Sequence, residues 1–203
     1  MDYAAVAVIS YLIGAIPTGY LVAKQARGID IRSIGSGKTG ATNILRSIGP
    51  AAFAFVFTFD FLKGFLCVLL AGQLTGNPMC SVVAGLAALV GHTWPVYIGF
   101  QGGRGVATGL GGAFAMAPVL SAVAVGVAVI MIAATRYMSM GSILGSSLVM
   151  VFSIISVIIG AQPLTLALYT VPGVLLIIVQ HKDNLLRLQA GTERKLGDTA
   201  DPR

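Results

Sequence analysis

The sequence predicts an all-α fold, a polytopic membrane helix bundle with seven transmembrane spans that forms a single domain over residues 1–203. The composition indicates a membrane protein, because 56% of the residues are hydrophobic, only 10% are charged and the mean hydropathy is +0.89. A soluble domain would carry about 25% charged residues. Long apolar runs alternate with four short stretches, 24–46, 92–108, 136–142 and 181–195, that hold nearly all of the Lys and Arg residues.

The apolar runs define the expected spans, since crossing a hydrocarbon core takes about 20 residues. In order, the spans are 3–23, 50–72, 79–99, 103–117, 119–135, 142–159 and 164–180. The first run ends at Lys24 without a cleavage site, which favours a retained helix over a signal peptide. The uncharged region 105–135 is too long for one helix and short for two, and Pro118 divides it.

Charge distribution decides how that region is divided and orients the bundle. With two passes there, all four basic stretches lie on one side, and the opposite loops around 73–78, 116–119 and 160–163 carry no charge. Because Lys and Arg concentrate in cytoplasmic loops, we expect the N-terminus outside and the C-terminus in the cytoplasm. The net charge of +6 borders membrane segments, so we expect anionic headgroups or phosphorylated ligands as partners and no nucleic acid.

The first basic stretch contains a glycine-rich segment, residues 33–43, in which glycines alternate with Ser, Thr and Lys. Glycines allow backbone N–H groups to turn toward an anion, and the hydroxyl and ammonium groups add donors. The Walker phosphate loop would need a glycine where Arg32 stands, so nucleotide hydrolysis is excluded while phosphate binding remains. The alternative is a flexible membrane loop.

The second and third stretches add His, Arg and Asn. A helix that starts near Gly102 would direct free N–H groups toward the cytoplasm, beside the bidentate donor Arg104. Alternatively, His92 is a hydrogen-bonded structural histidine and Arg104 snorkels to the headgroups. His181 and Asn184 share one face of an amphipathic segment that we expect to lie along the membrane surface.

Four residues within the apolar runs have structural explanations. Asp60 and Lys63 stand three apart in one span, and we expect a structural ion pair although charge inside a membrane is a functional signal by default. Cys67 and Cys80 match no metal or redox spacing, so we expect them to pack in the core. The tail from Gly197 is expected to be unstructured.

Together the segments resemble the bacterial acyl-phosphate:glycerol-3-phosphate acyltransferase family, PlsY. The resemblance covers nearly the whole chain and rests on three motifs in order: residues 35–43 (GSGKTGATN) followed by Arg46, residues 91–97 (GHTWPVY) with 102–108 (GGRGVAT), and residues 181–195 (HKDNLLRLQAGTERK). Two positions depart from the family pattern. Lys38 stands where the family commonly has Asn, and Arg104 where it commonly has Lys, and both departures keep hydrogen-bond donors.

The resemblance implies transfer of a fatty acyl group from acyl phosphate to the sn-1 hydroxyl of glycerol 3-phosphate, in a bacterial inner membrane with the site facing the cytoplasm. The products would be lysophosphatidic acid and phosphate, in phospholipid biosynthesis. Neither metal, acyl-CoA nor acyl carrier protein would be needed, so no cofactor is expected. Further expected partners are membrane lipid and the upstream enzyme that forms acyl phosphate.

The motif matches also assign residues. The first motif would bind the acyl-phosphate headgroup, whereas Arg46, Arg104, His181 and Asn184 would hold glycerol 3-phosphate. Catalytic contacts are expected from Ser36, His181 and Asn184, and substrate contacts from Gly35, Gly37, Lys38, Thr42, Asn43, Arg46, His92, Arg104, Ser142 and Glu193. The proton acceptor is left open between the leaving phosphate, His181 and His92.

Two other function classes fit parts of the pattern. A transporter for an organic phosphate would explain the basic cleft, but transport should place polar residues near the bilayer midplane. A non-catalytic scaffold that binds anionic lipid would not explain the ordered segments of Gly, Ser and Asn. The acyltransferase accounts for all of them.

Overall fold

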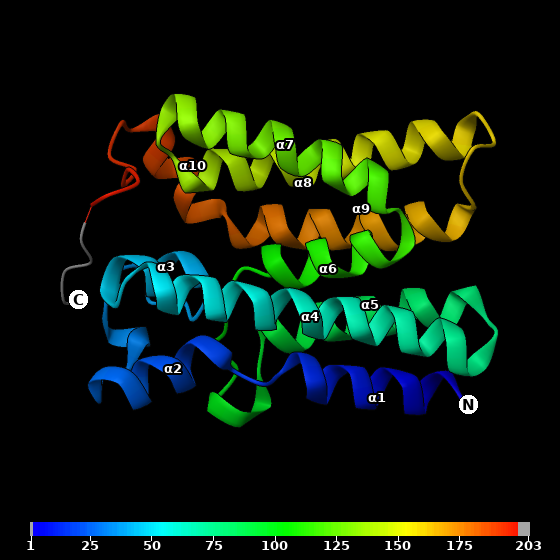
Figure 1. The fold of residues 1–203 in the computed structure, drawn as a ribbon, viewed down its shortest axis with the longest axis horizontal. Coiled ribbons are helices and arrows are strands. Elements are labelled where there is room, and N and C mark those ends of the chain that lie inside the picture. Colours follow the sequence, from blue (N-terminus) through cyan, green and yellow to red (C-terminus); the bar gives the residue numbers. More distant parts are fainter. Residues whose placement is uncertain (1, 199–203) are drawn as a thin grey trace.

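The protein is a bundle of α-helices, seen along its length in a computed structural model that describes residues 2–198 (Figure 1). Five of its helical segments are long and apolar enough to cross a membrane, and a sixth qualifies if the bent pair α9–α10 counts as one. The helices are α1 (Tyr3–Gly14), α2 (Thr18–Arg27), α3 (Ala41–Ser47), α4 (Pro50–Thr75), α5 (Pro78–Thr93), α6 (Val106–Met116), α7 (Pro118–Thr135), α8 (Met138–Ile158), α9 (Leu164–Gln180) and α10 (Lys182–Gln189), with 3-10 helices η1 (Ile31–Ser33) and η2 (Val96–Ile98).

The first span is broken in the middle. Pro17 lies between α1 and α2, where its ring and its missing N–H prevent one continuous helix. The break leaves the backbone carbonyl of Ile16 free to accept a hydrogen bond from Lys63 of α4, at 3.1 Å. The break between α1 and α2 therefore provides a carbonyl oxygen that holds the buried ammonium group of Lys63 in place.

The fourth expected span, 103–117, is only partly correct. Residues 101–105 are not helical, and α6 begins at Val106 after Gly105, whose φ of 85° requires glycine. The helix start that we expected near Gly102 is therefore wrong. With 11 residues α6 rises only about 16 Å, roughly half of a hydrocarbon core of about 30 Å.

Close packing against α4 holds this short helix. A Cβ on Gly64 of α4 would lie 2.0 Å from the Thr108 carbonyl oxygen, and one on Gly111 of α6 would lie 2.0 Å from the Phe61 carbonyl oxygen. Helices in membranes approach closely through such small residues. Glycine on both helices thus lets α6 pack backbone to backbone against α4.

The polar segments gather at one end of the bundle. In Figure 1, α2, α3, α10 and the C-terminal segment lie at the end opposite the N-terminus. Arg136, after α7, joins this group, because its backbone carbonyl accepts from the Leu196 N–H at 2.6 Å and its guanidinium donates to the Leu196 carbonyl at 2.7 Å. Ser142, expected as the first residue of the span 142–159, lies within α8, which begins four residues earlier. The expected unstructured tail lies outside the described residues beyond Asp198.

Candidate active site

A polar cavity of about 100 Å³ lies where the three glycine- and charge-rich segments meet. Eight of the predicted site residues line it: Ser36, Lys38, Thr42, Asn43, His92, Arg104, Ser142 and His181. The remaining five, Gly35, Gly37, Arg46, Asn184 and Glu193, are not part of its lining. The structure therefore brings together segments that are far apart in the sequence, as predicted.

Backbone contacts hold the three segments against one another. The N–H of Thr39, in the first segment, donates to the Gly102 carbonyl in the second at 3.3 Å. The Arg104 Nε of the second segment donates to the Gln180 carbonyl, directly before the third, at 3.2 Å. The cavity walls are therefore joined independently of any ligand.

Asn43 organises the first segment. Its Oδ1 accepts from the Ser36 N–H at 3.2 Å, and its Nδ2 lies within hydrogen-bond distance of three carbonyl oxygens, those of Ile31, Ile34 and Lys38. Gly35 and Gly37 have φ of 58° and 68°, so the tight course of the loop needs glycine. Asn43 and these two glycines shape the segment that presents Ser36 and Thr42 to the cavity.

Arg104 supplies a buried positive charge. Burial lowers the pKa of its guanidinium to about 10, which still leaves it protonated at neutral pH. Its Nε is anchored on the Gln180 carbonyl, and the side chain lines the cavity. A guanidinium held in this way suits a phosphate group, which it can bind through two parallel hydrogen bonds.

His181, at the junction of α9 and α10, is held as a neutral imidazole. Its Nδ1 lies 2.8 Å from the Ile177 carbonyl oxygen, and because a carbonyl only accepts, Nδ1 carries the proton. Burial lowers the pKa of His181 to about 4, and the hydrogen bond to Ile177 does not offset this effect. The ring therefore offers Nε2 as a weakly basic acceptor.

Glu193 fastens the C-terminal segment beside the cavity. Its side chain, 3% exposed, accepts from Ser139 at 2.8 Å, Asn184 Nδ2 at 2.7 Å and Arg187 Nε at 2.8 Å. Arg46 of α3 donates to the next residue's carbonyl, that of Arg194, at 3.0 Å. Asn184, Arg46 and Glu193, three predicted site residues outside the cavity lining, thus join α3, α8 and α10 through this segment.

The Glu193 contacts predict a pH-dependent stability. Burial raises the pKa of this carboxyl, but the hydrogen bonds from Arg187, Asn184 and Ser139 outweigh it and hold the pKa below 4.5. A lowered folded-state pKa means that the carboxylate stabilises the fold above about pH 4.5, and that this is lost as the pH falls through the folded value. Glu193→Gln should lower the Tm in detergent clearly at pH 7 and less at pH 4, and the loss should shrink further as the pH falls through the folded-state pKa.

The exposed carboxylate of Asp183, on the same helix, provides the matched control. Asp183→Asn should leave the Tm unchanged at both pH values. An equal loss of Tm for Glu193→Gln at pH 7 and pH 4 would contradict the charge-assisted role of Glu193.

Sequence reasoning missed several residues of the cavity wall. Asp60 was expected to form a structural ion pair, which it does with Lys63 at 2.9 Å, but it also lines the cavity beside His92. Phe53 and Phe57 of α4 and Met138 of α8 line it too. The one sequence feature that could have identified the α4 residues is their spacing: Phe53, Phe57 and Asp60 recur at helical intervals and therefore share one face of α4.

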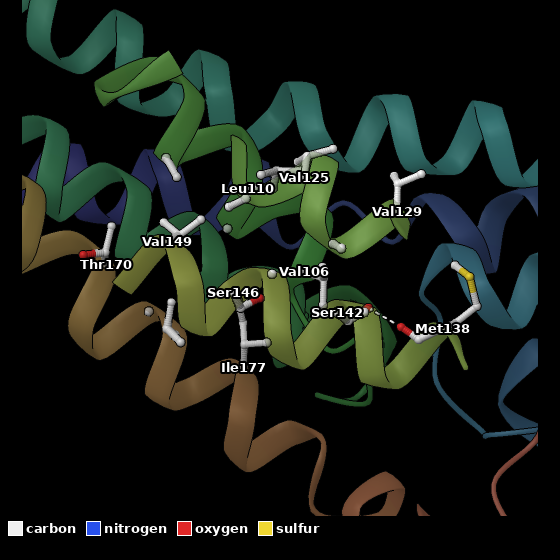
Figure 2. Close-up of a pocket in the computed structure, with 18 of the residues that line it drawn as sticks. Val106, Leu110, Val125, Val129, Met138, Ser142, Ser146, Val149, Thr170 and Ile177 are labelled. Carbon is white, nitrogen blue, oxygen red and sulfur yellow. Dashed lines mark hydrogen bonds between the residues drawn. The ribbon is translucent and has the colours of Figure 1, made fainter. Parts of the chain in front are cut away.

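An apolar groove of about 390 Å³ adjoins the cavity and runs between α4, α6, α7, α8 and α9. Figure 2 shows Val106, Val149 and Ile177 from three helices around this space, and Ser142 bonded to the Met138 carbonyl. Five residues line both spaces: Phe53, Phe57, Val106, Met138 and Ser142. The site can therefore hold a polar group and an attached apolar chain at the same time.

Across residues 2–198, no three His, Cys, Asp or Glu side chains are grouped so that they could hold a metal ion. The polar groups that the cavity offers are cationic, hydroxyl and amide groups, the imidazoles of His92 and His181, and one carboxylate, that of Asp60.

Comparison with known proteins gives one consistent family. Residues 4–191 match the family model described as "Glycerol-3-phosphate acyltransferase". The chain is 42% identical to glycerol-3-phosphate acyltransferase 3 of Dehalococcoides mccartyi (strain CBDB1), with 96% of each chain covered, and 40% identical to the glycerol-3-phosphate acyltransferase of Clostridioides difficile (strain 630), with 97% and 96% covered.

Solved structures agree with these sequence relatives. The crystal structure of PlsY, described as an integral membrane glycerol 3-phosphate acyltransferase, in its glycerol 3-phosphate form superposes with a TM-score of 0.89 at 35% identity, covering 96% of each chain. Its lysophosphatidic acid form gives a TM-score of 0.86 at 34% identity, covering 95% of this chain and 94% of that one. The chain therefore belongs to the PlsY family of integral membrane glycerol-3-phosphate acyltransferases.

Proposed function

We propose that the protein transfers a fatty acyl group from acyl phosphate to the sn-1 hydroxyl of glycerol 3-phosphate, giving lysophosphatidic acid and phosphate. The observation that carries this proposal is the junction of a cationic cavity with an apolar groove through shared wall residues. An acyl phosphate has the same two parts, a phosphate headgroup and a hydrocarbon chain. Family membership supports glycerol 3-phosphate as the acceptor.

The two substrates divide the cavity between them. The loop with Ser36 and Thr42 would bind the acyl-phosphate headgroup, and Arg104 and His181 from the opposite segments would hold glycerol 3-phosphate. Ser142 lies where cavity and groove meet, and its hydroxyl, which donates to the Met138 carbonyl at 2.8 Å, would have to leave that bond to donate to the acyl carbonyl. Bringing two anionic substrates together in fixed orientation, with their charges compensated, supplies much of the rate acceleration.

The reaction needs no covalent intermediate on the protein. The sn-1 hydroxyl oxygen bonds to the acyl carbonyl carbon, the bond from that carbon to the phosphate oxygen breaks, and phosphate departs with the electron pair. The hydroxyl proton passes to the departing phosphate. His181 is a poor proton acceptor because its pKa is about 4. His92 is poorly placed to accept the proton, because its Nδ1 lies toward Asp60 and its Nε2 lies against Gly103.

Both cysteines lie away from this chemistry. Cys67 and Cys80 are buried, at 5% and 1% exposure, in a cluster with residues of α1, α4 and α5. We expect the double variant Cys67→Ala/Cys80→Ala to keep turnover within about threefold of wild type, because small core truncations cost stability before they affect a distant site. Loss of turnover in a folded double variant would indicate that a cysteine thiol takes part in the reaction.

The proposed topology has seven passes, with α6 as a short pass, the N-terminus outside and the cavity facing the cytoplasm of the inner membrane. Clustering of the basic segments at one end of the bundle supports it. In the cysteine-free background, Asp198→Cys should react with an impermeant thiol reagent only after the cells are opened, and Gln162→Cys in intact spheroplasts. The reverse pattern would overturn this orientation.

Filling the groove should impair long-chain donors selectively. Ser146→Phe places a ring among the groove residues of α8 (Figure 2), whereas Val151→Phe on the same helix projects from an exposed position. Because overpacking costs about 1–3 kcal/mol, kcat/KM for hexadecanoyl phosphate should fall about tenfold in Ser146→Phe. It should fall less for octanoyl phosphate and remain unchanged in Val151→Phe. Equal loss with both donors would argue against the groove as the acyl site.

Acceptor-dependent phosphate release tests the function directly. Purified protein in detergent would receive hexadecanoyl phosphate with and without glycerol 3-phosphate. We expect release only with the acceptor, accompanied by lysophosphatidic acid. No release from folded protein would contradict the proposal and move attention to uptake of glycerol 3-phosphate into liposomes.

A further inference from the structure

A buried charged cluster, two of whose members line the cavity, takes no part in the reaction described above. Asp60 and Lys63 of α4 form an ion pair at 2.9 Å with side-chain exposures of 2% and 7%, and His92 of α5 places Nδ1 3.7 Å from the same Asp60 oxygen. Lys63 also donates to the Ile16 carbonyl at the break between α1 and α2. The cluster therefore connects three parts of the bundle.

Stability alone does not explain this cluster. Removing two charges from water costs several kcal/mol per ion, and well-packed apolar residues often replace such pairs without loss of stability. Asp60 also lines the cavity, where a carboxylate is unfavourable for the phosphate groups of the proposed substrates. Its Oδ1 is buried and makes no aligned hydrogen bond within the described part of the chain, and it faces both the Lys63 ammonium at 2.9 Å and the His92 Nδ1 at 3.7 Å.

His92 in turn shapes the segment that carries Arg104. Its backbone carbonyl accepts from the Gly103 N–H at 3.1 Å. The imidazole lies directly on Gly103, since a Cβ at this position would be 2.1 Å from Nε2. The position of the ring therefore sets the course of the backbone immediately before Arg104.

We propose that Asp60 is a positioning residue that acts through His92. The carboxylate fixes the imidazole by its Nδ1 edge, the imidazole supports Gly103, and Gly103 sets where the Arg104 guanidinium meets the phosphate of the acceptor. Lys63, which is hydrogen-bonded to the Ile16 carbonyl, keeps the Asp60 carboxylate charged and in place. This inference rests on the proposed function, because it takes glycerol 3-phosphate as the acceptor.

Two double variants separate positioning from a simple ion pair. The charge swap Asp60→Lys/Lys63→Asp keeps a pair but turns a cation toward His92, and Asp60→Leu/Lys63→Met removes both charges. Both should purify as folded protein, but kcat/KM for glycerol 3-phosphate should fall about 100-fold, as expected when a binding group is misplaced by about 1 Å. The KM for acyl phosphate should stay near that of wild type. Wild-type kcat/KM for glycerol 3-phosphate in either variant would overturn the proposal.

His92→Leu provides the second arm if a double variant fails to fold, since it leaves the Asp60–Lys63 pair intact. It should show the same selective rise in KM for glycerol 3-phosphate, and combining it with Asp60→Leu/Lys63→Met should add little, because residues that act through one another are not additive. Additive losses, or a wild-type KM in His92→Leu, would overturn the role of His92. Acceptor-dependent turnover of the wild type is measured first, so a failure of the proposed function is seen separately.

Discussion

Replacing Arg104 by alanine should lower kcat/KM for glycerol 3-phosphate by about 10²–10³-fold. The substitution removes a buried cation that lines the cavity and is already anchored through Nε on the Gln180 carbonyl. Truncating one partner of a buried charge pair costs about 2–5 kcal/mol, much of it from leaving the other charge unpaired. Steady-state kinetics of purified protein in detergent, with both substrates varied, gives the value.

Arg104→Lys is the matched control. Lysine keeps the charge but loses the planar pair of donors and the Nε contact, so we expect a loss of no more than about tenfold. An alanine variant within tenfold of wild type would show that Arg104 does not bind the acceptor phosphate.

Asn184→Ala and Arg46→Ala should each abolish measurable turnover while leaving membrane insertion and purification intact. Neither side chain lines the cavity, and both hold the C-terminal segment, Asn184 through Glu193 and Arg46 through the Arg194 carbonyl. Asn184→Ala also leaves a charged, buried carboxylate with one donor fewer, which costs about 1.5–3 kcal/mol. The wall formed by α10 and His181 should lose its fixed position as a result.

Two further variants show how Asn184 acts. Ser139→Ala also leaves Glu193 with one donor fewer, but it removes the contact to α8 and keeps the Asn184 contact to α10, so it should retain most activity. Glu193→Ala should reproduce the loss seen in Asn184→Ala if the asparagine works only by holding Glu193. A much larger loss in Asn184→Ala would mean that its Oδ1, which is buried without a partner in the described residues, contacts substrate directly. Wild-type turnover in purified Asn184→Ala and Arg46→Ala would remove both from the site.

Most of the helices were predictable from sequence because apolar length is a local property. Expected spans 50–72, 119–135 and 164–180 match α4, α7 and α9 within a few residues, since proline or glycine marks their ends. The same local signals placed the glycine-rich segments between helices. They could not show that residues 101–105 are not helical, because that course depends on His92 and on the close approach of α6 to α4.

The residues of the candidate site were likewise only partly predictable from the sequence. Ser36, Arg104 and His181 were identified by residue type and motif, and the structure places all three on one cavity. Motif position could not distinguish a residue on the cavity wall from one that supports it, and Asn184 and Glu193 belong to the second group.

By itself the sequence determined that the chain is a helical membrane protein with its cationic, glycine-rich segments between the spans. Chain-wide apolarity and charge spacing do not depend on how the helices pack. Only the tertiary structure decided that Asp60 borders the polar cavity, that an apolar groove opens from it, and that the C-terminal segment braces it. These features arise from contacts between residues up to 148 positions apart, such as the Arg46 guanidinium with the Arg194 carbonyl, and no local pattern encodes such contacts.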